Sequence, residues 1–388
     1  MNVKQIYSVL NQINKEMYGD SAFEVINLSD FVSLGDSVLA NVQSRDKFIN
    51  TLYDRIAKTV IRNLDLELEY PSIMRDTIDY GAIIQKLSVN PRDAKTRVDW
   101  NTGSMSASDV ASAMFSIDKP SVRQKFFSGI NAWEIDTTIP DNLFKTAFTS
   151  PENMGAFMSA IMQATEDSVI MSINNTNRFA VNNFIGEKLH SGQNVIHLIT
   201  EYGDSSLDTI DKAIVDKGFL RFASKKIADV IRYMNVPTAL YNEEGAIRRT
   251  ARDNMHVILN GDFASATKTY LESDTFHNEL VSLPFYTETA CWQALGSTAD
   301  SETSRSYTAP NLSYTSGLSI NIASDGTEIS KNGIIGVIAD REAIATTVFE
   351  RETTADRLNR MSLTQRTDKV NIGYLNDLSE NGCVFVMD

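Results

Sequence analysis

The sequence predicts an α+β fold, in which helices and strands occupy separate stretches of the chain. A long helical pattern runs from Ser150 to Leu189, and no glycine or proline interrupts it between Gly155 and Gly186. Short strand-like segments lie on both sides of this pattern, without the regular strand–helix–strand alternation of a parallel α/β sheet. An apolar content of 42% is enough for a packed core.

The long helical pattern begins with a favourable cap. Ser150 can accept a hydrogen bond from the first turn, and Pro151 suits the first helical position because the N–H that it lacks would be unpaired there. One apolar stripe follows, mostly at steps of three, four or seven: Phe157, Ile161, Ala164, Thr165, Val169, Ile173, Ala180 and Phe184. Polar side chains largely off this stripe are expected to reach water: Glu166, Asp167, Asn174, Asn175, Arg178 and Asn182. A continuous helix would be about 60 Å long at roughly 1.5 Å per residue. The alternative is two helices broken at the Asn174–Asn175 pair.

Before this helix, residues 1 to about 65 carry two helical patterns. The apolar face of the first contains Val3, Ile6, Tyr7, Leu10, Ile13 and Met17. The second, which Ser44 could cap, contains Phe48, Leu52, Ile56, Val60 and Ile61. The segment between them, residues 28–41, is mixed and turn-like.

A projecting β-hairpin is predicted next. An apolar segment around Tyr80 to Leu87 precedes residues 101–119, which are polar and small and therefore expected to form an exposed loop. Within the strand-like stretch 122–139, exposed and apolar positions alternate: Ala132, Glu134 and Asp136 against Trp133, Ile135 and Thr137. Pro140 ends this strand, and Leu143, Phe144 and Phe148 give a short helical entry to Ser150.

After the long helix, the chain reads as a compact mixed lobe. We expect a buried strand over 194–200. A helix follows over Leu220–Met234 with Ala223, Ile227, Val230 and Ile231 on one apolar face, and the Asn235-Val236-Pro237 segment ends it. Then come strands over 256–259, around 285–292, within 313–322 and over 333–339. Asp262 and Asp340 are expected to cap short helices, the second over 341–347. Two strands, Lys369–Leu375 and Gly382–Met387, close the chain.

Composition limits the functional classes. The net charge of −14 on 388 residues argues against tight binding of nucleic-acid phosphates. The two cysteines, Cys291 and Cys383, are too few and too far apart for a disulfide scaffold or a zinc site. No apolar run is long enough to cross a bilayer, and the N-terminus lacks the pattern of a signal peptide.

Motifs that would specify an enzyme are missing from the sequence. It has no phosphate-binding glycine loop, no zinc-protease His-Glu-x-x-His motif and no serine nucleophile elbow. Its four histidines show no metal-ligand spacing, and His197 and His256 fall in predicted strands. Acidic residues 65–69 could hold a divalent cation through oxygen ligands, but a solvated charged edge is the favoured interpretation. Lys119 and Lys125 read as exposed side chains that could pair with acidic groups of a neighbour. We therefore predict no catalytic residue, no cofactor-binding residue, no cofactor and no metal.

The order of elements resembles the subunit of tailed-phage heads, the Hong Kong 97-like fold. Residues 122–162 resemble the same region in major capsid proteins of small phi29-like podoviruses, whose pattern T-I-x-D-x-L-x-x-x-A-F is matched by Ile139, Asp141, Leu143, Ala147 and Phe148. Tyr80-Gly81 fits the start of the hairpin region, and residues 333–360 resemble the closing segment of these proteins. The resemblance covers most of the chain from about residue 70, without the added immunoglobulin-like domain of the phi29 protein.

This resemblance implies a domain organisation. It assigns an N-terminal arm to residues 1–70, an extended-loop region to 71–141 and a peripheral domain with the spine helix to 142–202. It assigns an axial domain around five- and six-fold centres to 203–339. Residues 340–388 become C-terminal strands that return to the peripheral domain. The extended loop would overlap a neighbouring subunit.

The resemblance also implies a function and partners. The chain would be a major capsid protein that self-assembles as pentamers and hexamers into the icosahedral head around double-stranded DNA. Its partners would be copies of itself, scaffolding and portal proteins, and packaged DNA by non-specific proximity only, with no membrane. It would lie in the virion capsid, after assembly in the host cytoplasm. The alternatives are an encapsulin-type compartment and a hydrolase with an unrecognised site.

Apolar side chains of the hairpin region are the expected contacts between subunits. They are Phe126, Phe127, Trp133 and Ile135. On this hypothesis, Trp133→Asp leaves the monomer folded but blocks assembly, whereas loss of monomer solubility would identify Trp133 as a core residue.

Overall fold

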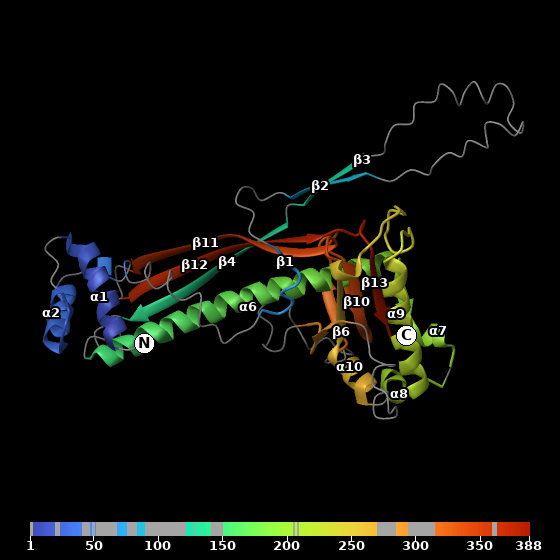
Figure 1. The fold of residues 1–388 in the computed structure, drawn as a ribbon, viewed down its shortest axis with the longest axis horizontal. Coiled ribbons are helices and arrows are strands. Elements are labelled where there is room, and N and C mark those ends of the chain that lie inside the picture. Colours follow the sequence, from blue (N-terminus) through green and yellow to red (C-terminus); the bar gives the residue numbers. More distant parts are fainter. Residues whose placement is uncertain are drawn as a thin grey trace, which may run out of the picture. The chain divides into compact units, whose positions relative to one another are not determined.

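The structure, a computed structural model, describes residues 3–19, 24–40, 47–48, 51, 68–75, 84–89, 122–127, 129–140, 150–204, 206–207, 209–269, 285–293, 315–358 and 363–388 (Figure 1). The chain forms two compact units, each built from three separate stretches of sequence. Unit 1 comprises Met1–Asp79, Ile130–Asn177 and Thr346–Gly373. Unit 2 comprises Tyr80–Gly129, Arg178–Ala345 and Tyr374–Asp388.

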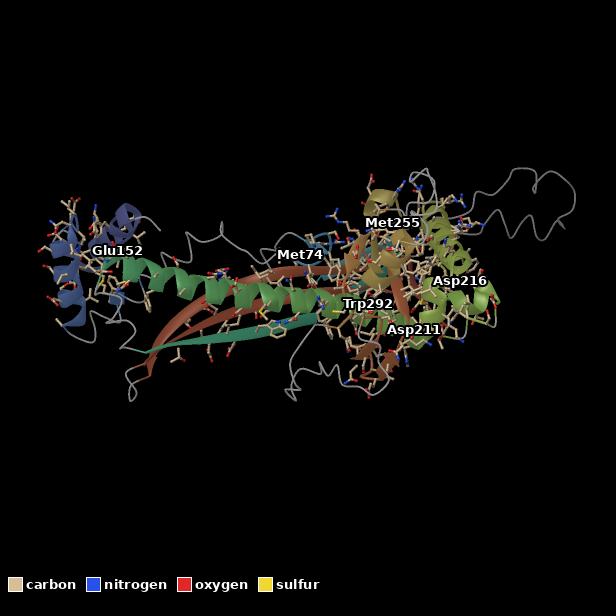
Figure 2. All side chains as sticks on the ribbon, turned by 90° about the horizontal axis from the view of Figure 1, so that it is seen from below. Met74, Glu152, Asp211, Asp216, Met255 and Trp292 are labelled. Carbon is tan, nitrogen blue, oxygen red and sulfur yellow. The ribbon has the colours of Figure 1, made fainter. Side chains whose placement is uncertain are left out.

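A single helix, α6 (Pro151–Ser191), contributes to both units (Figure 1). It is 41 residues long and unbroken, which confirms the long helix and excludes a break at the asparagine pair. The predicted cap is also confirmed, because the Asn153 N–H donates to Ser150 Oγ at 3.2 Å. Glu152, labelled in Figure 2, lies in the first turn, where a negative charge favours the helix dipole.

Unit 1 begins with two helices, α1 (Val3–Tyr18) and α2 (Leu28–Leu39). The first was predicted, and its Leu10, Ile13 and Met17 are buried. The turn-like interpretation of residues 28–41 is wrong. A capping box starts α2, in which the Asp30 N–H donates to Asn27 Oδ1 at 2.9 Å while the Asp30 carboxylate accepts from the Asn27 N–H at 3.3 Å. The predicted helix that Ser44 would cap lies largely outside the described residues.

The sheet of unit 1 has the strand order β1-β11-β12-β4. Its strands are β1 (Met74–Arg75), β11 (Ile344–Leu358), β12 (Leu363–Asn376) and β4 (Gly129–Pro140). The alternation predicted along β4 is confirmed over residues 132–136, where every second side chain is exposed. The other side chains, Trp133 and Ile135, pack against a cluster of Val169, Val370 and Ile372. Pro140 ends the strand as expected.

The helix predicted over residues 341–347 is wrong, because a tight turn and the start of β11 occupy these positions. The Asp340 carboxylate accepts from the Glu342 N–H at 2.8 Å, and the Ala343 N–H donates to the Asp340 carbonyl at 2.8 Å. The residues that follow are rich in Ile, Thr and Val, whose branched side chains favour a strand.

The central sheet of unit 2 has the order β5-β13-β10-β6-β7. Its strands are β5 (Val195–His197), β13 (Gly382–Val386), β10 (Ile334–Asp340), β6 (Met255–Asn260) and β7 (Thr287–Thr289). β10 is antiparallel to both of its neighbours, β13 and β6. At the edges of the sheet, β5 is parallel to β13 and β7 is parallel to β6. Every residue of β13, β10 and β6 is buried, as their apolar runs predict. This unit also contains two separate antiparallel pairs of strands. In one, β2 (Ile84–Val89) pairs with β3 (Val122–Phe127). In the other, β8 (Leu318–Asn321) pairs with β9 (Glu328–Lys331).

Helices α7 (Leu198–Tyr202), α8 (Ile210–Val215), α9 (Lys217–Met234) and α10 (Gly261–Thr267) pack in the same unit, together with the 3-10 turn η3 (Arg252–Asn254) (Figure 1). The predicted face of α9 is confirmed and lies in one apolar cluster with residues of β6, β10 and β13. Asp216, labelled in Figure 2, caps α9 by accepting from the Phe219 N–H at 2.6 Å.

Three local predictions in unit 2 need correction. The strand expected over 194–200 ends at His197, where α7 begins, and its side chains are half-buried or exposed. The strand expected around 285–292 covers only Thr287–Thr289. The cap of α10 is Asn260 rather than Asp262, because the Asp262 N–H donates to Asn260 Oδ1 at 3.0 Å.

Residues 180–188 of α6 are buried on every side of the helix, which overturns the expectation that Asn182 reaches water. Asn182 donates to the Trp292 carbonyl at 2.7 Å, and Asn183 and Glu187 accept from the N–H groups of Ala323 and Ser324 at 2.7 and 3.0 Å. Gly186 permits this close approach, because a Cβ at this position would lie 2.8 Å from Ile322 Cγ2.

Candidate functional site: a two-faced hairpin

The β2–β3 hairpin has two chemically different faces. Its register pairs Gln85 with Phe126, Leu87 with Gln124, and Val89 with Val122. Because directly opposed residues of an antiparallel pair point to the same side, these six side chains form one face, which we call the outer face. The intervening pairs, which include Lys86 with Lys125 and Ser88 with Arg123, form the inner face.

The outer face is exposed and largely apolar. Leu87 and Phe126 are each 63% exposed, and Val89 and Val122 are 59% and 57% exposed. Single exposed apolar side chains are ordinary on protein surfaces, but four on one small ribbon form a patch of the kind that marks a contact site.

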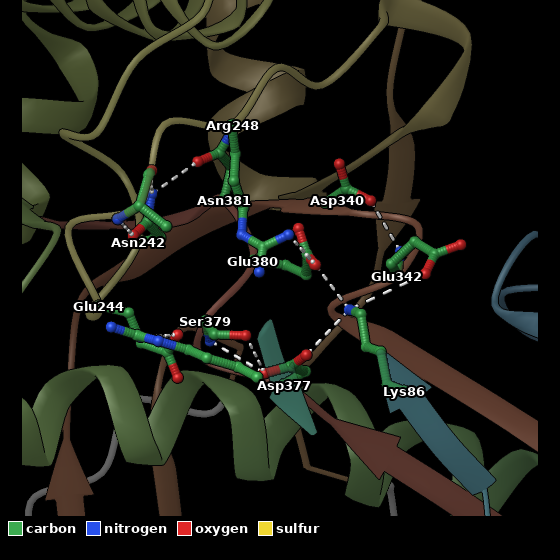
Figure 3. A network of polar contacts seen from close by, with 12 residues as sticks. Lys86, Asn242, Glu244, Arg248, Asp340, Glu342, Asp377, Ser379, Glu380 and Asn381 are labelled. Atoms are coloured by element: carbon green, nitrogen blue, oxygen red, sulfur yellow. Dashed lines mark hydrogen bonds and ion pairs between the residues drawn. The ribbon is translucent and has the colours of Figure 1, made fainter. Parts of the chain in front are cut away.

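The inner face carries three cations that meet carboxylates of the same unit (Figure 3). Lys86 Nζ lies 2.8 Å from Asp377 and 2.7 Å from Glu380, with Glu342 at 3.8 Å. Lys125 Nζ lies 2.7 Å from Glu244 and 3.2 Å from Asp377. Arg123 also pairs with Glu244. Ion pairs therefore hold the inner face of the hairpin against its own unit, while the outer face stays exposed to solvent.

Two of these carboxylates, Asp377 and Glu380, lie in the turn between β12 and β13, where other groups hold them. Asp377 Oδ1 accepts from the N–H and the hydroxyl of Ser379 at 3.0 and 2.6 Å. Glu380 accepts from Arg248 at 2.7 Å. The carboxyl groups of Asp377 and Glu380 are only 1% and 8% exposed, so the cations on the hairpin satisfy charges that water reaches poorly (Figure 3).

The pKa values in this network favour its charged form. Burial opposes ionisation of Asp377, but hydrogen bonds from Lys86 and Ser379 and the charges of Lys86 and Lys125 outweigh it and lower the pKa to about 2. Burial likewise opposes ionisation of Glu244, and Lys125 and Arg123 outweigh it, so that its pKa also lies below the usual value. In turn, Glu244 and Asp377 outweigh the effect of burial on Lys125 and raise its pKa.

The four apolar residues expected at subunit contacts occupy different places. Phe126 lies on the outer face, and Phe127, half-buried, lies on the inner face opposite Ile84. Trp133 and Ile135 lie on β4 in unit 1, where they pack against the cluster of Val169, Val370 and Ile372. Trp133→Asp would therefore place a carboxylate against an apolar cluster of the same chain, so it is a poor probe of assembly.

Sequence reasoning missed the carboxylates that hold the hairpin. It predicted that Lys125 could pair with a neighbouring subunit, whereas the carboxylates that Lys125 contacts belong to its own unit. Lys119 and most of the acidic run 65–69 lie outside the described residues. The one available signal was the position of the cations: Arg123 and Lys125 lie two residues apart, and Lys86, Arg123 and Lys125 each lie one residue from an apolar side chain of the same strand. Asp377 and Glu244 lie 252 and 119 positions from Lys125, and no local pattern predicts such pairings.

Other chemistry is sparse in the part of the chain that the structure describes. No group of three or more His, Cys, Asp or Glu side chains there could hold a metal ion. His197 and His256 lie in strands β5 and β6 as predicted, and Cys291 and Cys383 are free, buried thiols. None of the described helices combines the length and the apolarity needed to cross a bilayer.

Comparison with known proteins identifies relatives over almost the whole chain. The model of the family described as "Phi29-like phage major capsid protein" matches residues 10–386. The major capsid protein of Bacillus phage GA-1 is 23% identical over 291 residues, which cover 73% of this chain and 54% of that protein. That of Bacillus phage PZA is 22% identical over 267 residues, covering 68% and 54%. The chain thus spans about half the length of the curated relatives it matches.

Solved structures agree on the fold. A chain from the capsid structure of Staphylococcus phage Andhra is similar with a TM-score of 0.56 and 10% identity, over 85% of this chain and 87% of that one. A chain from a structure of native bacteriophage P68, described for its head fiber and inner core protein gp22, is similar with a TM-score of 0.55 and 9% identity, over the same shares. At such low identity, this likeness establishes the fold alone.

Proposed function

Because the chain belongs to the family of Phi29-like phage major capsid proteins, we propose that copies of it associate as pentamers and hexamers into the icosahedral head around the double-stranded DNA genome. A member of this family is a structural component of the phage capsid and not an enzyme. Its α+β fold is of the Hong Kong 97-like type, as the resemblance predicted.

The observation that carries the proposed assembly is the outer face of the hairpin. In a shell, each subunit contacts several neighbours, and no single contact has to be large. Covering Leu87, Val89, Val122 and Phe126 with a second copy removes apolar surface from water at roughly 25 cal/mol per Å². The second copy is the natural occupant, since a lattice brings identical chains together at high local concentration.

The finer organisation is part of the same proposal. Residues 1–70 act as an N-terminal arm and 71–141 as the extended-loop region that reaches a neighbour. Residues 142–202 form the peripheral domain around α6, 203–339 form the axial domain at five- and six-fold centres, and 340–388 supply strands that return to the peripheral domain. Phe126 is the best placed of the four expected contact residues. Phe127 lies on the opposite face of the same hairpin, and Trp133 and Ile135 pack within unit 1.

The partners and location follow from this role. Scaffolding and portal proteins direct assembly in the host cytoplasm, and the finished subunit lies in the virion. The net charge of −14 is consistent with a shell that encloses packaged DNA without binding its phosphates tightly.

Electron microscopy of the purified protein, alone and with a candidate scaffolding protein, tests the proposal. Uniform hollow spheres are the expected result. Monomers under every condition would contradict it. Particles isolated from infected cells should contain the genome and a portal, whereas an enzyme as cargo would indicate a compartment of another kind.

A further inference from the structure

Two carboxylates beneath the hairpin, Asp377 and Glu380, also have partners outside the hairpin. Asp377 is fixed by Ser379, and its own N–H donates to the Ala343 carbonyl at 2.8 Å. The neighbouring Asn381 bonds the Thr250 hydroxyl at 3.1 Å. Hence Asp377, and Glu380 through Arg248, are held by contacts that do not involve the hairpin, as in a preformed binding site, which we call the receptor.

The charges of this receptor and of the hairpin match. Four carboxylates pair with the hairpin's cations: Asp377, Glu380, Glu244 and Glu342. Arg248 on Glu380 supplies one positive charge, which leaves three negative charges among these paired side chains, whereas Asp340 accepts from the Thr250 hydroxyl. The inner face of the hairpin brings three cations: Lys86, Arg123 and Lys125. Close by on α6, Lys188 lies 3.3 Å from Glu243, a pair that is neutral in sum.

Only one orientation of the hairpin satisfies these groups. Turning it over would place the apolar outer face on these carboxylates and would take Lys86 and Lys125 away from the buried Asp377. Leaving a buried charge unpaired is among the most costly changes in a protein. Turning it over would also hide the surface that Leu87, Val89, Val122 and Phe126 present.

We propose that Asp377, Glu380 and Glu244 are positioning residues for assembly: they bind the cationic face of the hairpin and thereby direct its apolar face toward a second copy of the chain. This inference rests on the proposed function. It assigns to these residues a role in self-association although they lie on the opposite side of the hairpin from the contact.

The first experiment uses the unassembled full chain. Trypsin cleaves after Arg123 and Lys125, and its rate reports how often the hairpin leaves the carboxylates. Asp377→Asn should raise this rate on the order of tenfold to a hundredfold, because Lys86 and Lys125 lose a buried partner. Asp377→Glu, which keeps the charge, should restore most of the protection. The matched control is Asp325→Asn, an exposed aspartate of the same unit that pairs with His190 and should leave the cleavage rate unchanged.

The second experiment follows particle formation by electron microscopy with the same variants. Asp377→Asn should lower the yield of particles at least tenfold, and Asp377→Glu should recover it. Lys86→Met, made on the hairpin, serves as a second variant if Asp377→Asn fails to fold, and it should act in the same direction.

The outcomes separate this inference from the proposed function. Faster cleavage with unchanged particle yield would overturn the positioning role while leaving capsid assembly intact. Unchanged cleavage in both Asp377→Asn and Lys86→Met would show that the carboxylates do not hold the hairpin. Failure of the unmodified chain to form particles would contradict the proposed function, whatever the cleavage rates.

Discussion

At the scale of single residues, polar side chains within α6 anchor other segments instead of interrupting the helix. Asn177 is fully buried, and it donates to the Glu69 carbonyl at 2.9 Å while accepting from the Thr346 hydroxyl at 2.6 Å. Asn174 belongs to the asparagine pair at which the alternative of two helices would place a break, and its Oδ1 accepts from the Glu69 N–H at 2.9 Å. These asparagines join three separate stretches of unit 1, and the helix continues because their amides find partners off the helix.

Asn177→Ala tests this anchoring. The substitution leaves the Glu69 carbonyl and the Thr346 hydroxyl short of a buried partner, so the free energy of unfolding should fall by about 1–3 kcal/mol. Urea denaturation followed by circular dichroism measures it. Asn153→Ala, at an exposed position of the same helix, is the control and should change stability by less than about 0.5 kcal/mol. Equal effects of the two substitutions would contradict the anchoring role.

The carboxylates beneath the hairpin predict a dependence on pH. The folded pKa of Asp377, about 2, lies below the ordinary aspartate value, so its contribution is fully present above about pH 4 and is lost as the pH falls toward 2. The lowered pKa of Glu244 acts in the same direction. Because the pKa of Lys125 is raised, its contribution is present below about pH 10 and is lost only at higher pH.

Hydrogen exchange checks this pH dependence. The ratio of exchange rates between the β2–β3 amides and those of the buried strand β10 removes the intrinsic effect of pH. This ratio should be constant from about pH 5 to 9 and should rise below about pH 4. A rise centred near neutrality would point to a different titrating group.

At the scale of elements, the hairpin divides its two tasks between its two faces. The period-two alternation of a strand places cations and apolar side chains on opposite sides, so one ribbon can bind its own lobe and still offer an apolar surface.

The double variant Phe126→Ser/Val122→Ser tests the outer face. Both side chains are exposed, so the stability of the monomer should change by less than about 0.5 kcal/mol, while particle yield should fall at least about tenfold. Val215→Ser is the matched control for Val122→Ser alone, because Val215, the last residue of α8, is 53% exposed and Val122 is 57% exposed. Normal particles from the double variant would exclude the outer face from assembly.

At the scale of the whole molecule, the net charge opposes association. Copies that each carry a net charge of −14 repel one another. Salt reduces the range of this repulsion, because the Debye length is about 10 Å at 0.1 M ionic strength and shorter at higher ionic strength.

Assembly of the unmodified chain should therefore be faster at about 0.5 M than at about 0.05 M sodium chloride. Light scattering during assembly measures this rate. The Phe126→Ser/Val122→Ser variant should remain slow at both concentrations, since salt does not replace a lost apolar contact. Slower assembly of the unmodified chain at high salt would indicate that ion pairs dominate the contacts between copies.

Much of this protein follows from its sequence alone. The α+β class, the unbroken α6 with its Ser150 cap, the buried strands β6, β10 and β13, and the stripe of α9 were predicted because each depends on a local pattern: a cap, a period or an apolar run. The amino-acid sequence of residues 122–162 also indicated the family, and the match over residues 10–386 confirms it.

The tertiary structure decided what the local patterns could not. Whether Asn182 faces water or the Trp292 carbonyl, and whether Lys86 and Lys125 are free or seated on Asp377, depends on segments more than a hundred residues away. Burial and ionic pairing are properties of what chain folding brings together, and a side chain's own sequence neighbours specify neither. For this reason the strands of the hairpin could be predicted from the sequence, whereas the direction in which its apolar face points could not.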